Sequence, residues 1–225
     1  MLIPRWTILQ VAGVNFFVRY FNGLESNPPQ DFWDDMTDVI TTQFLSFRTA
    51  CVSCHNGWHH LEKINLWLTP KLRSQFWQTS AFLARTDFFL QGERNGNYRY
   101  LRQDRVFGAY TGAVGATNPG NRPQRLNATI TKPVFLLSGE AAQSGNWRTE
   151  FARMVTQDRQ FARATMNYLW TYFFGSGIVD PPDGWDLARG FGTNPFSVIV
   201  ILEPAGVASM LKVQVPPKPR EGSSI

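Results

Sequence analysis

All cysteines and histidines of this 225-residue chain lie within ten consecutive positions. The two cysteines are Cys51 and Cys54, and the three histidines are His55, His59 and His60. The metal-binding and redox chemistry of these residue types is therefore confined to one short segment. Hydrophobic residues make up 43% of the chain and aromatic residues 14%, which is enough for the buried core of one large domain or two small ones.

Cys51, Cys54 and His55 have the spacing of a c-type haem attachment site. Two thiols separated by two residues can form two thioether bonds to a haem, while the histidine directly after the second thiol takes an axial position on the iron. We therefore expect these three residues to bind haem c, with His55 as an axial iron ligand.

Three alternatives to haem stay open. Cys51, Cys54 and His59 match the first three ligands of a C-x2-C-x4-H-x4-C zinc knuckle, but the fourth position is Ile64 and a structural zinc site needs four ligands. A local redox disulfide is the second alternative, although thioredoxin-like C-x-x-C pairs follow a strand in a βαβ pattern that the sequence does not show. The third is a motif that binds nothing.

A ligand on the other face of the iron has to come from elsewhere. Residues 58–68 are predicted to be helical, which places His59 and His60 on the same side of the iron as His55. The remaining candidates are thioethers, unless the sixth position is open. These are Met36, Met154, Met166 and Met210. Each methionine taken singly is more typical of a core than of a ligand site.

The hydrophobic spacing predicts a mainly α-helical fold. We expect helices at 7–22, 31–45, 58–68, 70–85, 147–157 and 159–175. Residues 91–146 are rich in Gly, Asn, Pro and Arg and predict a loop-rich insertion with a few short β segments. Residues 180–186 carry three aspartates around two prolines, and they predict a turn rather than a calcium loop. The expected fold is an irregular helical domain.

The net charge of +5 comes from 22 basic residues, mostly arginines, against 17 acidic ones. Arginine favours carboxylate, phosphate and sulfate groups, so an anionic glycan is a candidate partner. Four arginines of the insertion alternate with tyrosines at 94–105, a pattern that nucleic-acid binding could use, but we expect an ordinary solvated loop and no nucleic-acid partner. No run reaches the roughly 20 apolar residues of a membrane span.

Two blocks of sequence resemble a known pair of domains. The first comprises CVSCHNG at 51–57 and HLEKINLWL at 60–68, and the second comprises FARATMNYLW at 161–170, FGSGIVDP at 174–181 and DGWDLAR at 183–189. They resemble the domains of unknown function 1549 and 1553 that occur together in exported planctomycete and acidobacterial proteins, often joined to cytochrome c domains. The first block is similar to the C-terminal part of the 1549 domain and the second to the start of the 1553 domain.

The resemblance implies a division of the chain into four parts. They are a 1549-like part at 1–90, the insertion at 91–146, a 1553-like part at 147–193 and a tail at 194–225 outside the family pattern. Residues 196–215 are β-prone where the family continues with helices, so we expect this tail to pack poorly.

The resemblance also implies an extracytoplasmic, haem-associated protein, with Cys51, Cys54 and His55 matching the family's cysteine–histidine motif. Haem is attached covalently outside the bacterial cytoplasm, which predicts a periplasmic or cell-surface location. Residues 7–18 make a poor signal peptide, so the export signal is expected outside this fragment. Electron transfer to a redox partner protein is the leading hypothesis. A component of a polysaccharide-degrading system, or a zinc or structural binding module without haem, is the alternative.

Overall fold

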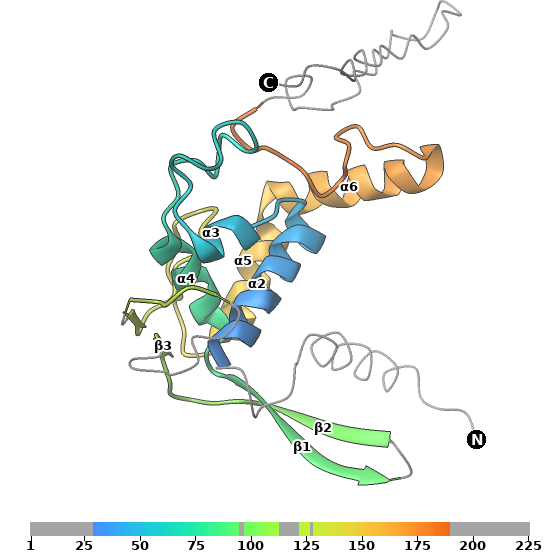
Figure 1. The fold of residues 1–225 in the computed structure, drawn as a ribbon. Helices are drawn as coiled ribbons and strands as arrows, with labels where there is room; N and C mark the ends of the chain where they lie inside the picture. Colours follow the sequence, from blue (N-terminus) through green and yellow to red (C-terminus); the bar gives the residue numbers. More distant parts are fainter. Residues whose placement is uncertain (1–28, 95–96, 113–121, 127, 190–225) are drawn as a thin grey trace, which may run out of the picture.

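The structure is a computed structural model, and it describes residues 29–94, 97–112, 122–126 and 128–189 (Figure 1). Its helices are α2 (Pro29–Leu45), α3 (Ala50–Cys54), α4 (Arg73–Ser80), the 3-10 helix η1 (Ala81–Leu83), α5 (Trp147–Gln157) and α6 (Arg159–Phe174). Its strands are β1 (Thr86–Arg94), β2 (Asn97–Asp104), β3 (Tyr110–Thr111) and β4 (Thr129–Ile130). The prediction of a mainly α fold with short β segments is confirmed.

Helix α2 is the centre of the arrangement. It contacts α3, α4, α5, α6 and η1, and Figure 1 shows α5 running beside it. Trp33, Met36 and Ile40 recur every three to four residues and are buried, so one side of α2 faces the core. None of the helices in the described ranges is long and apolar enough to cross a membrane.

The core joins parts of the chain that are far apart in sequence. One cluster of buried hydrophobic residues extends from Trp33 to Val155 and includes side chains of α2, α4, α5 and the loops between them. Phe151 of α5 stacks on Phe82 at a centroid distance of 5.2 Å and meets Phe135 edge-on at 5.8 Å. The described residues of the segments 1–90, 91–146 and 147–193 therefore share one core.

The loop-rich insertion contains more pairing than its composition indicates. Strands β1 and β2 form an antiparallel hairpin that begins before residue 91, and the register shifts between Leu90 and Gly92. Strands β3 and β4 pair through two residues each, and Val134 bridges Ala141. The expectation of short β segments holds, whereas the long hairpin was not predicted.

Most predicted helices are present, with one clear exception. The helices expected at 31–45, 147–157 and 159–175 correspond to α2, α5 and α6, and the one expected at 70–85 begins only at Arg73. The helix expected at 58–68 is wrong, because this segment forms successive turns. Some of its backbone N–H groups donate to side chains, as described below. The helix expected at 7–22 and the tail at 194–225 lie outside the described residues.

Candidate functional site

The two cysteines lie on one turn of the short helix α3. Both thiols are free and half-buried, and the spacing of three residues places them on the same side of the helix. The helix starts after Thr49, whose backbone N–H donates to Oδ1 of Asp38 in α2 over 2.7 Å. This hydrogen bond from Thr49 attaches the start of α3 to α2.

The environment of Cys51 keeps its thiol neutral. Burial raises the pKa of Cys51, and the nearby Asp38 and Cys54 raise it further. A reactive dithiol needs the opposite shift, because the thiolate is the nucleophile. The geometry therefore gives no support to a thioredoxin-like exchange site at this position.

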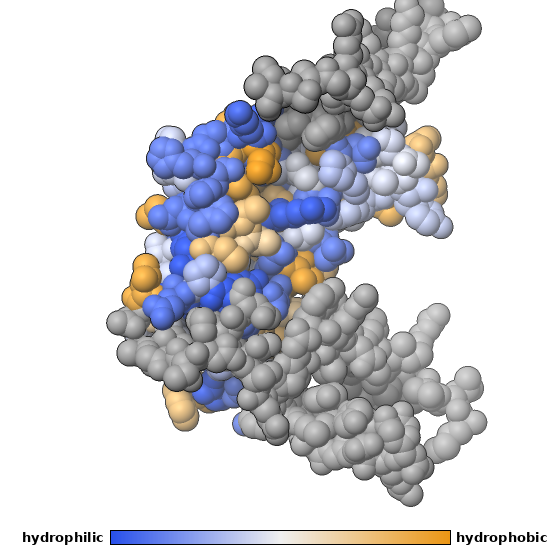
Figure 2. Space-filling model, in the orientation of Figure 1, coloured by the Kyte–Doolittle hydropathy of each residue, from blue (hydrophilic) through white to orange (hydrophobic). Residues whose placement is uncertain are grey.

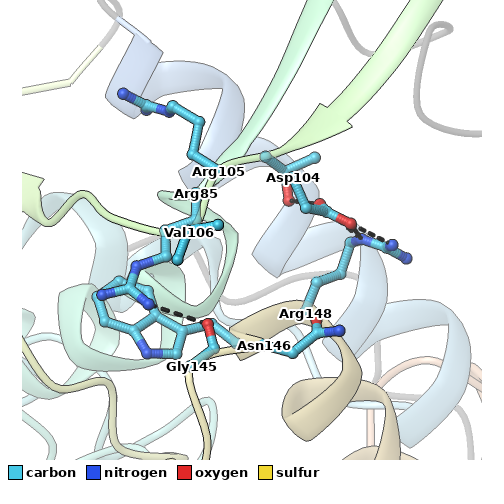
Figure 3. A pocket seen from close by; sticks show the side chains of 9 residues that line it. Arg85, Asp104, Arg105, Val106, Gly145, Asn146 and Arg148 are labelled. Atoms are coloured by element: carbon cyan, nitrogen blue, oxygen red, sulfur yellow. Dashed lines mark hydrogen bonds and ion pairs between the residues drawn. The ribbon is translucent and has the colours of Figure 1, made fainter.

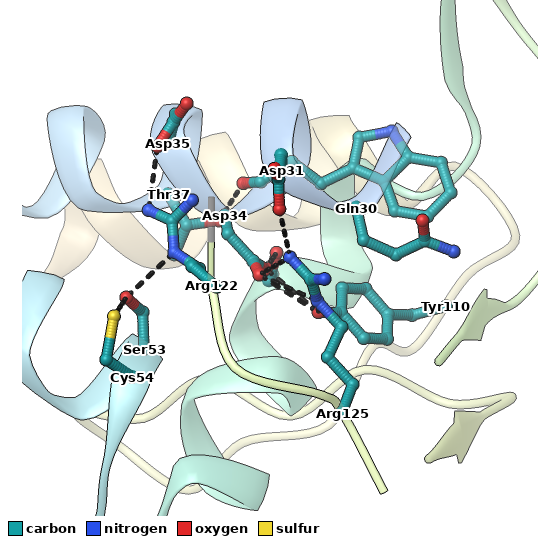
Figure 4. A network of polar contacts seen from close by, with 12 residues as sticks. Gln30, Asp31, Asp34, Asp35, Thr37, Ser53, Cys54, Tyr110, Arg122 and Arg125 are labelled. Atoms are coloured by element: carbon teal, nitrogen blue, oxygen red, sulfur yellow. Dashed lines mark hydrogen bonds and ion pairs between the residues drawn. The ribbon is translucent and has the colours of Figure 1, made fainter. Parts of the chain in front are cut away.

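Ser53, one of the two residues between the cysteines, is held by two arginines, of which Figure 4 shows Arg122. Its hydroxyl accepts from Nε of Arg122 at 2.9 Å, and Nη2 of the same arginine forms an ion pair with Asp35 of α2 at 2.7 Å. The Ser53 carbonyl accepts from Nε of Arg73 in α4 at 3.1 Å. The segment that carries both thiols is thus fixed to α2 and α4.

His55 follows α3 directly, and its ring has a defined tautomer. Nδ1 lies 2.8 Å from the carbonyl oxygen of Asn56, which can only accept, so Nδ1 carries the hydrogen and Nε2 presents a lone pair. The His60 ring lies beside the His55 ring at a centroid distance of 4.2 Å. His60 therefore lies beside His55, and turns rather than the expected helix place it there.

Residues 55–72 form a loop that is closed at its base. Gly57 donates its N–H to the Lys71 carbonyl at 2.8 Å. Farther along, the buried carboxylate of Asp186 accepts the backbone N–H of Leu66 at 2.8 Å and of Trp67 at 3.1 Å. Leu61 and Asn65 still donate to backbone carbonyls four residues earlier, but at Leu66 and Trp67 the bonds to Asp186 take the place of helical ones.

The residues of this segment fit a haem. The donor set comprises two free thiols on one helical turn and an imidazole whose Nε2 is available, which is the set that thioether attachment and axial ligation require. The same loop also exposes large apolar side chains: Trp58 is 56% exposed, Ile64 is 64% exposed and Leu66 is 42% exposed.

The methionines proposed as distal ligands have different settings. Met36 and Met154 are buried in the core cluster, whereas Met166 is 62% exposed on α6. Met210 lies outside the described residues. Within the described part of the chain, no group of three or more His, Cys, Asp or Glu side chains is arranged to hold a metal ion.

A buried polar network below α3 was missed by sequence reasoning (Figure 4). Arg125 forms ion pairs with Asp31 at 2.6 Å and Asp34 at 2.8 Å, and its Nε donates to the Tyr110 hydroxyl at 2.8 Å. Ser80 donates to Asp34 at 2.6 Å. One signal was available, since four carboxylates of α2 stand at positions i, i+3, i+4 and i+7 and so share one side of the helix. They are Asp31, Asp34, Asp35 and Asp38.

A second feature is a cavity of about 240 Å³ beside the start of α5 (Figure 3). Arg85, Arg105 and Arg148 line it. Arg85 lies over the Trp147 ring at 3.6 Å and donates to the Gly145 carbonyl at 2.9 Å. Of the four arginines noted in the insertion, only Arg105 has a described side chain. The side chains of Arg94, Arg99 and Arg102 are outside the described set.

We compared the chain with protein families, curated proteins and solved structures. No model of a protein family, no curated protein and no solved structure matches this chain.

Proposed function

We propose that Cys51, Cys54 and His55 attach a c-type haem and that the protein transfers electrons outside the cytoplasm. The observation that carries this proposal is the His55 ring, whose Nδ1 is engaged by Asn56 while Nε2 is left for a ligand, in the residue directly after the second of two free thiols. Metal-binding histidines commonly donate their second ring N–H to a backbone carbonyl in this way, which fixes the tautomer and the orientation of the ring.

Each residue of the site has a role in this proposal. Cys51 and Cys54 form the thioether bonds, and His55 supplies the axial nitrogen. Arg73 and Arg122 hold the segment between the thiols in place through Ser53. When bound, the haem supplies a one-electron couple between ferric and ferrous iron, and the protein controls access to it and its potential.

The proposal includes a location and a partner. Covalent haem attachment takes place outside the bacterial cytoplasm, so the protein is placed in the periplasm or at the cell surface. A haem that only carries electrons needs a second redox protein as donor or acceptor. The resemblance of residues 51–68 and 161–189 to exported, cytochrome-associated domains supports the same assignment.

The test is expression of the full chain together with a cytochrome c maturation system. We expect a haem band that survives denaturing electrophoresis and a Soret absorption, both of which disappear in Cys51→Ala/Cys54→Ala. The control is Lys63→Ala, an exposed position in the loop after the cysteines, which leaves both thiols and their supports intact and should keep covalent haem. Stoichiometric zinc without any haem would overturn the proposal in favour of a metal-binding module.

A second candidate, contact with an anionic glycan, is favoured by the cavity at α5. Among the described contacts, the Arg85 guanidinium donates to the carbonyls of Gly108 and Gly145 but meets no carboxylate, so its charge is available to a ligand. We expect a uronate or sulfated oligosaccharide to bind there and Arg85→Gln to weaken it by about tenfold. Arg153→Gln, on the exposed side of α5, is the control. Equal binding by both variants would exclude the cavity.

A further inference from the structure

Helix α6 turns a polar side towards the fold. Gln160, Ala164 and Asn167 are its buried residues. Gln160 donates from Nε2 to the Leu45 carbonyl at 3.0 Å, and the Asn167 side chain both donates to and accepts from the backbone of Val179, at 2.8 Å and 3.0 Å. The attachment of α6 to the rest of the molecule thus uses hydrogen bonds more than apolar packing.

The outward side of α6 is strongly apolar. The last turn is the most exposed part: Tyr172 is 82% exposed, Phe173 71% and Phe174 66%, compared with 62% for Met166 and 47% for Leu169. This end of the helix extends away from α2 and α5 in Figure 1, and hydrophobic residues are visible at its tip in Figure 2. A surface helix of a globular protein normally has the opposite distribution.

The exposed apolar residues have the spacing of a helix-packing surface. Ala162, Met166, Leu169 and Phe173 follow one another at intervals of four, three and four residues, and all four are exposed. This is the a/d pattern of a heptad, in which a stripe of apolar side chains packs into the holes of a facing helix. We call these four residues the α6 stripe.

We propose that the α6 stripe is the contact surface of a homodimer in which two α6 helices pack antiparallel. Arg159 and Arg163 lie in the N-terminal half of α6, and its last turn has no basic residue. An antiparallel pair places these arginines beside the C-terminal end of the other helix, where the helix dipole is negative. An anionic lipid surface is a poorer occupant, because the exposed tip has no cation to bind it.

The apolar area is sufficient for such a contact. Aromatic side chains have surfaces of about 150–250 Å² each, so Met166, Leu169 and Phe173 of the stripe, with Tyr172 beside it, expose on the order of 500 Å². That is near the upper end of the patches found on monomeric proteins, about 300–600 Å². Two copies would bury about 1,000 Å², which is the size of a weak and reversible interface.

Sedimentation equilibrium of the full chain tests this inference. We expect a reversible monomer–dimer equilibrium in the micromolar range, and a dissociation constant at least tenfold higher in Leu169→Glu/Phe173→Glu. Both positions are exposed, so the variant should keep the wild-type circular dichroism and melting temperature. The matched control is Val106→Glu/Phe107→Glu, because these side chains are 86% and 76% exposed but lie far from α6 in sequence. This control should dimerise like the wild type.

Three results would overturn the inference. The first is a wild-type chain that stays monomeric at about 100 µM, well above the expected dissociation constant. The second is a dimer that Leu169→Glu/Phe173→Glu does not weaken. The third is a monomer that binds vesicles containing anionic lipid through the same residues. None of these readouts depends on haem, so the dimer can fail while the haem proposal stands.

Discussion

At the scale of single residues, Gly57 is the tightest point of the loop after the cysteines. A Cβ at this position would lie 2.1 Å from the Leu68 carbonyl oxygen and 2.4 Å from that of Thr69. Both are backbone atoms, which cannot rotate away as a side chain can. We expect Gly57→Ala to lower the free energy of unfolding by about 2–3 kcal/mol, measured by urea denaturation.

Gly145 provides the control for this prediction. The nearest atom to a Cβ at Gly145 is Nη1 of Arg85 at 3.7 Å, which is an ordinary contact. Gly145→Ala should therefore change the free energy of unfolding by no more than about 0.5 kcal/mol. Similar losses in the two variants would contradict the close approach at Gly57.

The Cys51 thiol gives a prediction about pH. Because burial raises its pKa above that of an unfolded thiol, about 8.5, the thiolate forms only at higher pH. In haem-free Cys54→Ser protein, the rate of iodoacetamide modification of Cys51 should rise with an inflection above that value. The same chain in denaturant should show its inflection near the model-peptide pKa of about 8.5. A folded-state inflection at or below the denatured one would show that Cys51 is not shielded.

At the scale of elements, the loop at 55–72 depends on Asp186. Asp186→Ala removes the acceptor of the Leu66 and Trp67 N–H groups, and each orphaned buried N–H costs about 1–3 kcal/mol. We expect amide hydrogen exchange of the loop to speed up by at least about tenfold, while α2 and α5 keep their protection. Asp183→Ala is the control, since Asp183 pairs with the exposed side chain of Arg48. A loop equally protected in both variants would contradict this role.

The same loop shows where sequence reasoning succeeds and fails. Helices α2, α5 and α6 were predicted from the spacing of their apolar residues. The side chains of Asn146 and Asp158 cap the starts of α5 and α6, and Gly175 ends α6 in a left-handed conformation. Residues 58–68 have apolar residues at similar intervals, yet they form only single turns, and the N–H groups of Leu66 and Trp67 donate to Asp186, about 120 residues away. No local pattern contains a partner at that distance. The hairpin of β1 and β2 was missed because its glycines and arginines resemble loop composition.

At the scale of the whole molecule, the pair of Arg125 and Asp34 joins α2 to the end of the insertion. The two side chains are 1% and 0% exposed and come from positions 91 residues apart. The acidic spacing on α2 could be read from the sequence, but it does not show which arginine meets it. The candidate residues Cys51, Cys54 and His55, in contrast, could be selected from the sequence because all three lie within five consecutive positions.

Removing one partner of this pair should weaken the entire fold. Arg125→Met leaves Asp34 buried without its guanidinium, which typically costs about 3–5 kcal/mol in the free energy of unfolding. The control is Arg148→Met, whose ion pair with Asp104 is 25% and 31% exposed and should contribute no more than about 1 kcal/mol. Guanidinium denaturation at pH 7 compares the two variants. Equal losses would mean that burial adds nothing to the Arg125 pair.

The pH dependence of Arg125→Met provides a sharper test. Burial already raises the pKa of Asp34, and Arg125 is the largest influence that lowers it. Without Arg125 the pKa of Asp34 should rise further above the unfolded carboxyl value of about 3.9, so the folded variant takes up this proton at a higher pH than the unfolded chain does. The folded state then binds more protons, so the variant should gain stability, relative to the wild type, as the pH falls from 7 to 5, by at most about 1.4 kcal/mol per pH unit. Arg125→Met/Asp34→Asn should lose this extra slope, because its amide does not titrate. A slope that persists in the double variant would assign the proton to another group.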